Sequence, residues 1–471
     1  MVDVCVIGAG PAGSTFAARM AELGYEVCLI ERARFPRRHL GESLSPGVLP
    51  LLETIGAREA VEASGFRRVR SVLVKWDAGL QVRQDSREQG LIVDRGSFDT
   101  LLLERARALG VRVLQPAVIR TRRHDENGWQ VCIEAEGRTF HIRAAFIADA
   151  SGRAAATGGR KTPTGCRTLA LYTYWRGCDL AERPRIEAGN EAWYWGVPLP
   201  DGTYNTLVFV DLKHFRMEKA RPLGARFREL LERSSLMTGC RDAHPIGPIR
   251  AADATPYLDQ DSVTPSSIKI GETALAIDPL SSSGVQKAIQ TALAGAVVCN
   301  TLLRKREASD AALRFYRQNL ADASERHCRF AAAHYASVAT RGAGAFWNDR
   351  ASHIGAQPPS PASDPIIAHA LSMARIELSD QLDFVDLPSI EGDFVMVKPA
   401  LRHPGLEGPV TYLGGWELAP LLRQLPAGLT MLQLAQAWSA SIPLKSALTI
   451  VGWLFNKGIL VGKPAERREF T

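Results

Sequence analysis

A glycine-rich motif near the N-terminus has residue types and spacing that suggest chemistry. Residues 8–13 read Gly-Ala-Gly-Pro-Ala-Gly, the pattern G-x-G-x-x-G. In this pattern Gly8 permits a tight turn, Gly10 lets the backbone approach a pyrophosphate, and Gly13 lets a helix pack closely on a strand. Glu31 follows at about the spacing at which a carboxylate binds the hydroxyls of a ribose. These residues therefore suggest the binding of an ADP-containing cofactor.

The segments around the motif are those that such a site needs. Residues 4–7 form a short apolar run, typical of a buried parallel strand, that leads directly into the glycines. Residues 14–23 have a helical pattern that ends at Gly24, and a second apolar run, residues 27–30, delivers Glu31. Together they predict a Rossmann-type domain. NAD and FAD share this motif, so the choice between them depends on other parts of the chain.

A second segment that could bind a cofactor begins at Asp278. Asp278-Pro279 fixes a rigid turn, and residues 281–284 supply backbone N–H groups without bulky side chains. Residues 285–298 read as a helix. The positive end of its dipole would favour the negative charge that develops on a reduced flavin. A plain helix cap with a serine-rich loop remains the alternative.

The charge distribution favours a local role for the basic residues. The formal charge is +7 and the pI about 9.0, but most basic residues are scattered, which argues against nucleic acid as a partner. The densest run, Arg34, Arg37, Arg38 and His39, follows the glycine motif closely. We interpret this run as phosphate-neutralising, with a solvated loop as the alternative.

The spacing of the cysteines bears on metal binding, and the N-terminal residues bear on the cellular compartment. The eight cysteines form no C-x-x-C pair, and Cys5 and Cys28 fall in predicted strands, so zinc and redox-dithiol sites are not expected. The first strand begins within three residues of Met1, which leaves no space for a signal peptide, and no apolar run is long enough to span a membrane. We therefore expect a cytoplasmic protein without a metal.

Four segments in order along the chain resemble the FAD-dependent monooxygenases and tryptophan halogenases. Residues 35–46 read FPRRHLGESLSP and residues 93–99 read VDRGSFD. Residues 147–153 read IADASGR, and residues 271–285 read GETALAIDPLSSSGV. The resemblance implies non-covalent FAD held by a Rossmann-type domain that is interwoven with a mixed-sheet substrate domain, an α/β fold.

The resemblance and the glycine motif together give a set of expected cofactor-binding residues. Within it, Arg95 is expected to reach the cofactor, and Asp149 belongs to the D-A-S-G turn. The full set is Gly8, Gly10, Pro11, Ala12, Gly13, Glu31, Arg32, His39, Gly41, Glu42, Ser43, Arg95, Asp149, Asp278, Pro279, Gly284 and Val285.

The source of electrons is left open by the sequence. A second strand, glycine motif and helix of the kind seen at residues 4–23 does not occur, so a separate Rossmann domain for NAD(P)H is not expected. We predict that NAD(P)H reduces the flavin directly or through a separate reductase, and that molecular oxygen is the co-substrate. His327 and His334 lie on a probable helix and neither stands in a motif, so no catalytic base can be named.

An aromatic segment bears on the substrate. Residues 193–198 read WYWGVP, which is similar to the W-x-W-x-I-P signature of tryptophan halogenases. Trp193 and Trp195 are therefore candidates for the walls of an aromatic substrate pocket, although such residues can also be plain core. Hydroxylation of a ring asks the protein mainly to exclude water and to position the ring.

A missing lysine argues against halogenation. Halogenases place a lysine in a G-F-x-x-K pattern, whereas residues 65–69 read GFRRV and put Val69 at that position. Lys75 could at best be a displaced substitute. We therefore predict a monooxygenase that hydroxylates an aromatic ring, with halogenation as the alternative.

The C-terminal third reads as a separate small domain. We predict interleaved FAD-binding and substrate domains over residues 1–353, a Pro- and Ser-rich linker over 354–365, and a small domain over 366–471. Strand-like runs at 394–397 and 410–413 precede helical patterns near 417–425, 430–438 and 445–457, and residues 455–461 resemble the closing helix and wing of winged-helix modules. Residues 430–441 carry no Lys or Arg, which argues against DNA binding. Peptide docking and simple packing both remain open.

The combination of these features resembles a subgroup of flavoproteins. Halogenase-like flavin segments, the missing lysine and a small C-terminal domain are similar to the protein-tryptophan hydroxylases of tryptophylquinone cofactor biogenesis, of the quinohemoprotein amine dehydrogenase type. The resemblance implies a tryptophan side chain of a precursor protein as substrate, docked near the C-terminal domain. A flavin-bound scaffold without oxygen chemistry is the non-enzymatic alternative.

Overall fold

The computed structural model describes residues 1–77, 79–84, 89–180, 183–217, 221–342, 344–352, 375–426 and 428–463. The chain divides into two compact units. The first comprises residues 1–309 and 316–357, and the second comprises residues 310–315 and 358–471. The predicted linker, residues 354–365, lies outside the described residues.

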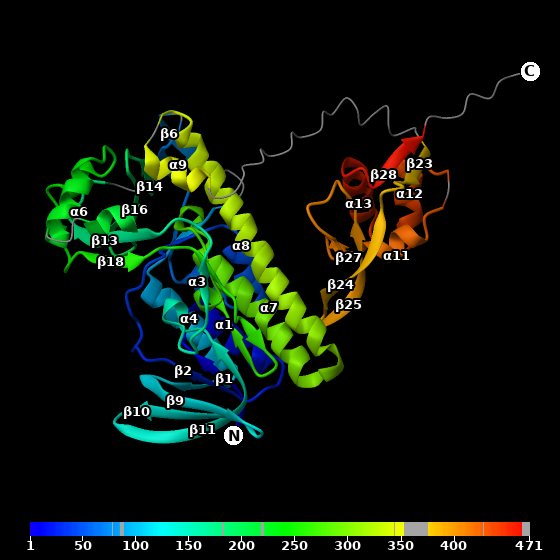
Figure 1. Cartoon of the computed structure of the whole chain (residues 1–471), viewed down its shortest axis with the longest axis horizontal. Coiled ribbons are helices and arrows are strands. Elements are labelled where there is room, and N and C mark those ends of the chain that lie inside the picture. The colour runs from blue at the N-terminus through cyan, green and yellow to red at the C-terminus, as the bar shows by residue number, and fades with distance from the viewer. Residues whose placement is uncertain are drawn as a thin grey trace, which may run out of the picture. The chain divides into compact units, whose positions relative to one another are not determined.

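A parallel sheet forms the centre of the first unit (Figure 1). Strand β1 (Val2–Ile7) lies between β2 (Val27–Ile30) and β11 (Arg138–Asp149), parallel to both. The order continues to β8 (Arg112–Leu114) on one side and to β21 (Ser267–Lys269) and β20 (Val263–Thr264) on the other. Strands β9 (Ala117–Asp125) and β10 (Gly128–Ala135) extend β11 as an antiparallel meander. The carboxyl ends of β1, β2 and β11 meet at one edge, where open α/β sheets bind their ligands.

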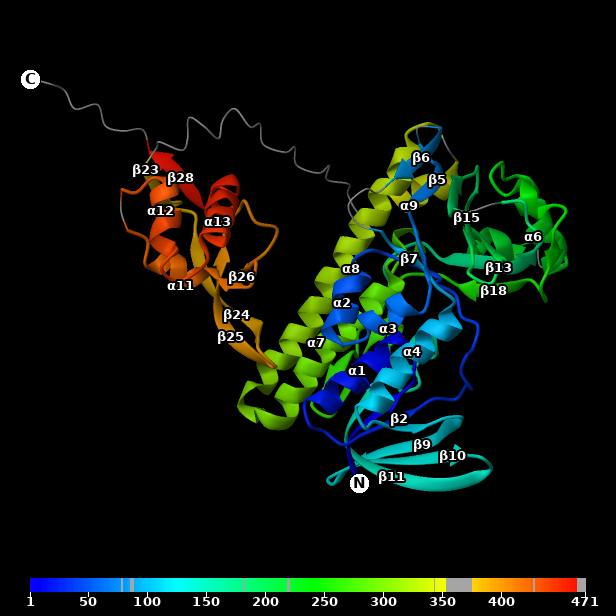
Figure 2. The ribbon, with the colours of Figure 1, turned by 180° about the vertical axis from the view of Figure 1, so that it is seen from behind.

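Helices pack around this sheet, as Figure 2 shows from behind. Helix α1 (Pro11–Glu22) contacts both α4 (Arg95–Ala108) and α7 (Gly284–Arg304). Gly295 lets α7 approach the sheet, because a Cβ there would lie 2.9 Å from Ile270 Cγ2. The other described helices of this unit are α2 (Val48–Thr54), α3 (Arg58–Ala63), α5 (Leu212–Met217), α6 (Leu223–Glu232), α9 (Ala345–Ala351) and, from residue 316 on, α8 (Ser309–Ala339). Within the described part of the chain, no helix is long and apolar enough to cross a membrane.

A second large sheet is built mainly from the middle of the chain. Its order is β17-β13-β16-β15-β14-β5-β6, with β18 also paired to β13. The strands are β5 (Ser71–Lys75), β6 (Leu80–Gln84), β13 (Thr168–Arg176), β14 (Arg185–Ala188), β15 (Ala192–Pro198), β16 (Tyr204–Asp211), β17 (His244–Pro245) and β18 (Arg250–Asp253). Since β5 and β6 precede β8 to β11 in sequence, the two sheets are interwoven, as the predicted fold class requires.

Two smaller sheets join these layers. Strand β7 (Leu91–Ile92) lies between β3 (Ser43–Leu44) and β4 (Arg67–Arg68). Strand β19 (Tyr257–Asp259) lies between β12 (Lys161–Pro163) and β22 (Leu275–Ala276). The first of these sheets orients the segment that follows the basic run, and the second leads into Asp278.

The second unit has its own apolar core, in which Leu418, Leu434 and Leu454 are fully buried. Within its described residues the helices are α11 (Leu418–Arg423), α12 (Met431–Trp438) and α13 (Leu444–Asn456), close to the predicted helical segments. Strand β23 (Arg375–Leu378) pairs with β28 (Leu460–Lys463), β24 (Asp383–Glu391) with β25 (Phe394–Arg402), and β26 (Tyr412–Leu413) with β27 (Trp416–Glu417). The long hairpin therefore precedes the helices, and a single strand follows them.

Candidate functional site

The glycine motif forms a tight turn between β1 and α1. Gly8 has φ +97°, and a Cβ there would lie 2.6 Å from the carbonyl oxygen of Ala150. A Cβ at Gly13 would lie only 1.8 Å from the carbonyl oxygen of Gly8. Only glycine fits either position, so the start of α1, including Pro11 and Ala12, is brought against the sheet as the motif predicts.

The acid at the end of β2 lies against this turn. Glu31 is 6% exposed, and its carboxylate accepts hydrogen bonds from the backbone N–H groups of Ala9 at 2.7 Å and Ala33 at 2.8 Å. The carboxylate is thus fixed at the carboxyl edge of the sheet, where an adenosine ribose is expected. The next residue, Arg32, is exposed.

One residue of the basic run lies over the glycine turn. The Nη2 atom of Arg37 is 3.8 Å from the position that a Cβ of Gly10 would take and 3.5 Å from Asp99 Oδ2. The Nη1 atom of Arg37 is buried and has no hydrogen-bond partner among the described residues. The unpaired Nη1 atom of Arg37 could donate to a phosphate oxygen, and Gly10 has no side chain that would block a phosphate. This arrangement fits the binding of a diphosphate.

Arg95 supports the backbone of the segment that follows the basic run. It is 5% exposed, pairs with Asp99 at 3.0 Å, and donates to the carbonyl oxygen of Leu40 at 2.5 Å. At Gly41, where φ is +98°, a Cβ would lie 2.9 Å from Arg95 Nη1 and 4.0 Å from Val285 Cγ2. The fold thus brings three of the four family-like segments together here. That Arg95 also reaches the cofactor stays a prediction.

Glu42 connects the same segment to the substrate sheet. Its Oε1 accepts hydrogen bonds from Tyr174 Oη at 2.7 Å and Asn205 Nδ2 at 2.9 Å, and its Oε2 accepts one from the N–H of Gly41 at 3.0 Å. Burial raises the pKa of Glu42, and the hydrogen bond from Tyr174 offsets part of that shift. The Tyr174 pKa is raised by burial and by the Glu42 carboxylate.

Two other predicted residues flank this connection. Ser43 pairs with Ile92 in the small sheet of β3 and β7. His39 lies with its Nδ1 atom 2.9 Å from the carbonyl oxygen of Leu40 and lines a small hollow that Glu42 also borders. These contacts fix the backbone of residues 39–43.

Asp149 shapes the turn that receives the glycine motif. Its carboxylate oxygens accept hydrogen bonds from the backbone and hydroxyl groups of Ser151 and Thr157, at 2.6 to 3.0 Å. Since the carboxylate is fully buried and these partners occupy it, its role in the structure is to hold the turn at Ala150, against which Gly8 packs.

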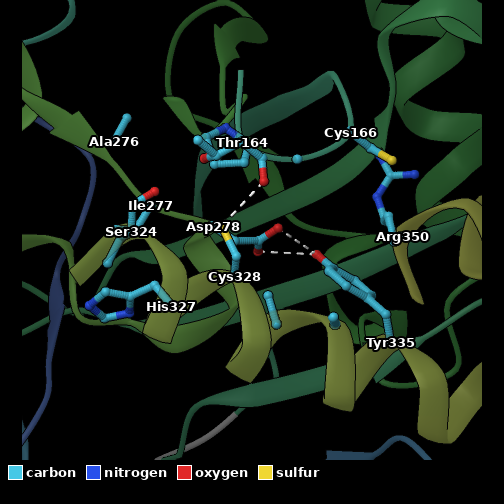
Figure 3. Close-up of a pocket in the computed structure, with 14 residues that line it drawn as sticks. Thr164, Cys166, Ala276, Ile277, Asp278, Ser324, His327, Cys328, Tyr335 and Arg350 are labelled. Carbon is cyan, nitrogen blue, oxygen red and sulfur yellow. Dashed lines mark hydrogen bonds between the residues drawn. The ribbon is translucent and has the colours of Figure 1, made fainter. Parts of the chain in front are cut away.

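The Asp278 segment forms a capped turn at the start of α7, partly visible in Figure 3. Asp278 accepts a hydrogen bond from the N–H of Leu280 at 3.0 Å, and Tyr335 Oη lies 3.1 Å from each of its carboxylate oxygens. Burial raises the pKa of Asp278. After Pro279, the helix begins at Gly284, which is exposed. No described atom lies within 4 Å of the position that a Cβ of Gly284 would take, so the N-terminus of α7 is open to a ligand.

A cluster of cations surrounds Glu272 near this turn. Burial alone would raise the pKa of Glu272, but the charges of Arg153, Lys287 and Arg95 bring it below the ordinary value. Lys287 is 2% exposed and donates a hydrogen bond to the carbonyl oxygen of Leu275, and burial lowers its pKa to about 8. The local positive field favours an anionic ligand.

The two predicted pocket tryptophans lie on one face of the substrate sheet. Trp193 is 2% exposed and stacks on Phe209, with ring centroids 3.7 Å apart. The edge of Trp76 packs against both Trp193 and Trp347, at 6.3 Å and 5.3 Å between ring centroids. Trp195 is half-buried and borders the same aromatic cluster.

Two residues from the flavin-like segments pack against this aromatic cluster, namely Leu40 and Leu280. The cluster therefore lies next to the segments expected to hold the flavin. Of its members, the sequence singled out only Trp193 and Trp195. Trp76, Phe209 and Trp347 were missed because they lie on distant segments outside any motif.

Val69 and Lys75, the two positions that bear on halogenation, lie in different surroundings. Val69 is half-buried and packs with Ile92, Val197 and Trp195. The Nζ atom of Lys75 is instead 3.0 Å from Glu187 Oε1 and 2.8 Å from Ser235 Oγ. The position expected for the halogenase amine is therefore apolar, and the nearest substitute is tied to a buried carboxylate.

A small, partly open pocket lies beside Asp278 (Figure 3). Tyr335 lines it and also belongs to the aromatic cluster. Its lining residues are Thr164, Gly165, Cys166, Pro256, Ala276, Ile277, Asp278, Ser324, His327, Cys328, Ala331, Ala332, Tyr335 and Arg350. Burial and the charge of Lys287 lower the pKa of His327, which favours its neutral form. No cluster of residues able to hold a metal ion occurs among the described positions.

Comparisons with known proteins agree with this geometry. The model of the family described as "FAD binding domain" matches residues 1–162. A Tryptophan 2-halogenase of Chondromyces crocatus is 31% identical over 336 residues, which are 67% of this chain and 64% of that protein, so the match spans just under two thirds of the halogenase. A 1H-pyrrole-2-carbonyl-[peptidyl-carrier protein] chlorinase of Pseudomonas fluorescens is 25% identical over 332 residues, 62% of this chain and 74% of that protein.

Solved structures match over nearly the whole chain. The flavin-dependent halogenase CmlS has a TM-score of 0.78 at 21% identity, covering 99% of this chain and 96% of its own. The peptidyl tryptophan dihydroxylase QhpG has a TM-score of 0.75 at 25% identity, covering 97% of this chain and 99% of its own. These matches show that residues 1–162 are similar to an FAD binding domain and that the chain has the fold seen in solved flavin-dependent halogenases and in QhpG.

Proposed function

We propose that this chain is an FAD-dependent monooxygenase that hydroxylates a tryptophan side chain within a polypeptide. The observation that carries the proposal is the apolar environment of Val69 together with the pairing of Lys75 to Glu187. When bound, FAD would supply the activation of molecular oxygen after reduction by NAD(P)H, directly or through a reductase. The alternatives are halogenation on the same flavin and a scaffold without oxygen chemistry.

The residues of the site have distinct roles in this proposal. Glu31 and Arg37 bind the ADP part of FAD, and the open N-terminus of α7 with the cations near Glu272 stabilises negative charge on the flavin ring. The aromatic cluster that buries Trp193 excludes water from the site, and the half-buried Trp195 is the one of the two tryptophans with surface left to contact the substrate ring.

A polypeptide substrate is supported by two observations. QhpG, described as a peptidyl tryptophan dihydroxylase essential for tryptophylquinone cofactor biogenesis, is similar over both units of this chain. The second unit also exposes large apolar side chains on its helices, with Leu432 53%, Leu444 45% and Leu448 45% exposed. Isolated exposed leucines are ordinary, but several on a small unit fit a docking role.

The halogenase alternative is supported by the names of the sequence relatives, which include a tryptophan halogenase and a pyrrole chlorinase. Halogen transfer would need a free amine near the aromatic cluster. To carry the halogen, Lys75 would have to break its hydrogen bonds to Glu187 and Ser235. The buried Glu187 carboxylate would then lose its paired cation, which is unfavourable. This cost favours hydroxylation over halogenation.

The test is intact-mass analysis of candidate precursor proteins after incubation with the FAD-loaded enzyme, a reductant, oxygen and bromide. Hydroxylation predicts the addition of one or two oxygen atoms at one tryptophan and no bromine. Lys75→Ala, with Lys213→Ala as the control on an exposed helix, should leave this product unchanged. A brominated product that disappears in Lys75→Ala would establish the halogenase instead.

A separate measurement addresses the scaffold alternative. The reduced holoprotein is mixed rapidly with oxygen, and the flavin absorbance is followed in time. An enzyme should reoxidise within its turnover time and yield oxygenated polypeptide. Reoxidation no faster than that of free reduced flavin, with no product from any tryptophan-containing precursor offered, would support the scaffold.

A further inference from the structure

Two cysteines that lie far apart in sequence meet at the apolar cluster of the substrate sheet that includes Leu171 and Val208. Cys178 follows β13, and Cys240 ends a short helical turn, residues 238–240. Their Sγ atoms are 3.2 Å apart and share a thiol hydrogen bond. Local spacing does not reveal this dithiol because the pair is not of the C-x-x-C type.

The backbone on both sides holds the two thiols in place. A Cβ at Gly239 would lie 2.6 Å from the carbonyl oxygen of Asp179, so the two segments are in close contact there. Arg176 and His244, a few residues away, are paired between β13 and β17. The approach of the sulfurs is thus imposed by the fold rather than by loose loops.

The two thiols differ in exposure and acidity. Cys178 is half-buried, whereas Cys240 is 1% exposed and belongs to the apolar cluster behind the sheet. The hydrogen bond between them lowers the pKa of Cys178 and raises that of Cys240. Cys178 is therefore suited to be the attacking thiolate and Cys240 the sheltered partner that resolves it.

Other cysteines of the chain have inert surroundings. Burial raises the pKa of Cys5 and Cys299, and it raises the pKa of Cys28 to about 11. The half-buried thiol of Cys328 donates a hydrogen bond to the carbonyl oxygen of Thr164, and burial raises the pKa of Cys328 as well. These thiols remain protonated near neutral pH.

We propose that Cys178 and Cys240 are a redox couple that hydrogen peroxide converts into an intramolecular disulfide. The thiol of Cys178 loses its proton to solvent, its thiolate attacks a peroxide oxygen, the O–O bond breaks, and the departing hydroxide takes up a proton, so that a sulfenic acid and water form. The sulfur of Cys240 then attacks the Cys178 sulfur, the S–O bond breaks, and the disulfide and a second water are released. Two electrons pass from the two sulfurs to one peroxide. This inference does not rest on the proposed function.

The disulfide would tie the end of β13 to the segment that braces the sheet. That segment includes Ser235 and Leu236, whose backbone N–H groups bind Glu187 of β14. A covalent link across 62 residues constrains the unfolded chain more than the folded one. The oxidised protein should therefore melt at a higher temperature than the reduced protein.

The primary test needs no variant. Reduced full-length holoprotein is treated with hydrogen peroxide, free thiols are blocked with N-ethylmaleimide, and the protein is analysed by intact mass and peptide mapping. The expected result is a loss of two hydrogens, two fewer blocked thiols, and linked peptides containing Cys178 and Cys240. Peptides linked between two molecules, or both thiols still blocked, would overturn the proposal.

Variants separate the two chemical steps. Cys240→Ser should stop at the sulfenic acid on Cys178, which dimedone labels, and Cys178→Ser should show neither label nor link. Cys132→Ser, a half-buried cysteine on β10, is the matched control and should keep the link and the rise in melting temperature. Direct conversion of Cys178 to a sulfinic acid in the wild-type chain, with Cys240 still free, would contradict the mechanism.

Discussion

The guanidinium of Arg37 lies beside the dinucleotide turn with one buried nitrogen that has no acceptor among the described residues. Its other terminal nitrogen is 3.5 Å from Asp99 Oδ2. A diphosphate at the open face of Gly10 would give the unpaired nitrogen a charged acceptor. The contribution of Arg37 should therefore appear in cofactor affinity more than in folding.

Arg37→Met should weaken FAD binding by about tenfold to a hundredfold, since a hydrogen bond to a charged group contributes about 1.5–3 kcal/mol. Titration of the apoprotein with FAD, followed by flavin fluorescence, measures the change in Kd. Arg34→Met is the matched control, because Arg34 belongs to the same basic run but is exposed. Equal affinities for the two variants would show that Arg37 does not bind the cofactor.

Lys287 makes stability depend on pH in a predictable direction. Burial lowers its folded-state pKa to about 8 from the ordinary value of 10.5. Between these pH values the unfolded chain binds more protons than the folded one, so stability rises with pH and levels off above the ordinary pKa. Below about pH 8 both states carry the charge, and the folded state bears its full desolvation cost.

The stability difference between the wild-type chain and Lys287→Met should therefore grow by about 3 kcal/mol in favour of the wild type as pH rises through this window. Urea unfolding at several pH values measures it. Lys445→Met, at an exposed position of α13, corrects for the general effect of losing a lysine. A difference that stays constant with pH would mean that Lys287 remains charged when folded.

Strand β13 of the substrate sheet helps to hold residues 39–43, the segment that contains Glu42. Tyr174 donates a hydrogen bond to Glu42, while Tyr172 of the same strand makes an edge contact with the Tyr174 ring at 6.3 Å. Both rings are partly buried. Of the two hydroxyl groups, that of Tyr174 is the one that donates a hydrogen bond to Glu42, next to Gly41. This difference provides a matched pair of substitutions.

Tyr174→Phe should weaken FAD binding several-fold and lower the melting temperature, because a buried carboxylate loses a donor worth about 1–3 kcal/mol. Tyr172→Phe should leave both quantities close to the wild-type values. Flavin titration and thermal unfolding measure them. If both variants bind FAD like the wild type, Glu42 is not the link between the sheet and the cofactor segment.

The elements that the sequence predicted are those with a local signal. The glycine turn, the strand that leads into Glu31 and the helix after Asp278 each depend on a few adjacent residues, and the structure has them in place. The aromatic cluster brings together Trp76, Trp193 and Tyr335 from three distant segments. No short-range pattern encodes such a meeting, which arises only when the sheets and α8 pack.

The same reason explains which site features escaped prediction. Arg37 was included in a basic run, yet its neighbours Arg34 and Arg38 looked equivalent to it in sequence. Local spacing does not reveal the contact of Cys178 with Cys240, because this contact depends on β13, β17 and the turn at residues 238–240. Side-chain pairing across the fold is thus the part that composition and spacing leave undetermined.

At the scale of the whole molecule, the flavin-like segments and the second unit occupy separate stretches of the chain. Every segment that forms the glycine turn, the Glu42 connection and the Asp278 turn lies in the first unit. A chain ending at Ser363 should therefore bind FAD with the wild-type stoichiometry. In the proposed function it should lose most turnover of the polypeptide while oxidising free tryptophan as poorly as before.

The measurement is FAD content together with product mass for the polypeptide and for free tryptophan. Adding back the separate C-terminal segment tests whether the loss comes from missing substrate docking. Full turnover of the polypeptide by the shortened chain would rule out a docking role for the second unit. Loss of FAD would instead mean that the first unit depends on the second for its fold.

The interweaving of the two sheets has a consequence for synthesis on the ribosome. Strand β5 pairs with β14, whose residues are translated more than a hundred positions later. At about 5–20 residues per second the nascent β5–β6 hairpin waits on the order of ten seconds for its partner. During that time the edge of β5 is unpaired and the apolar side of Trp76 is uncovered. Ribosome-arrested chains ending near residue 180 should therefore be cut by protease within residues 71–76, and chains released beyond residue 352 should be protected there.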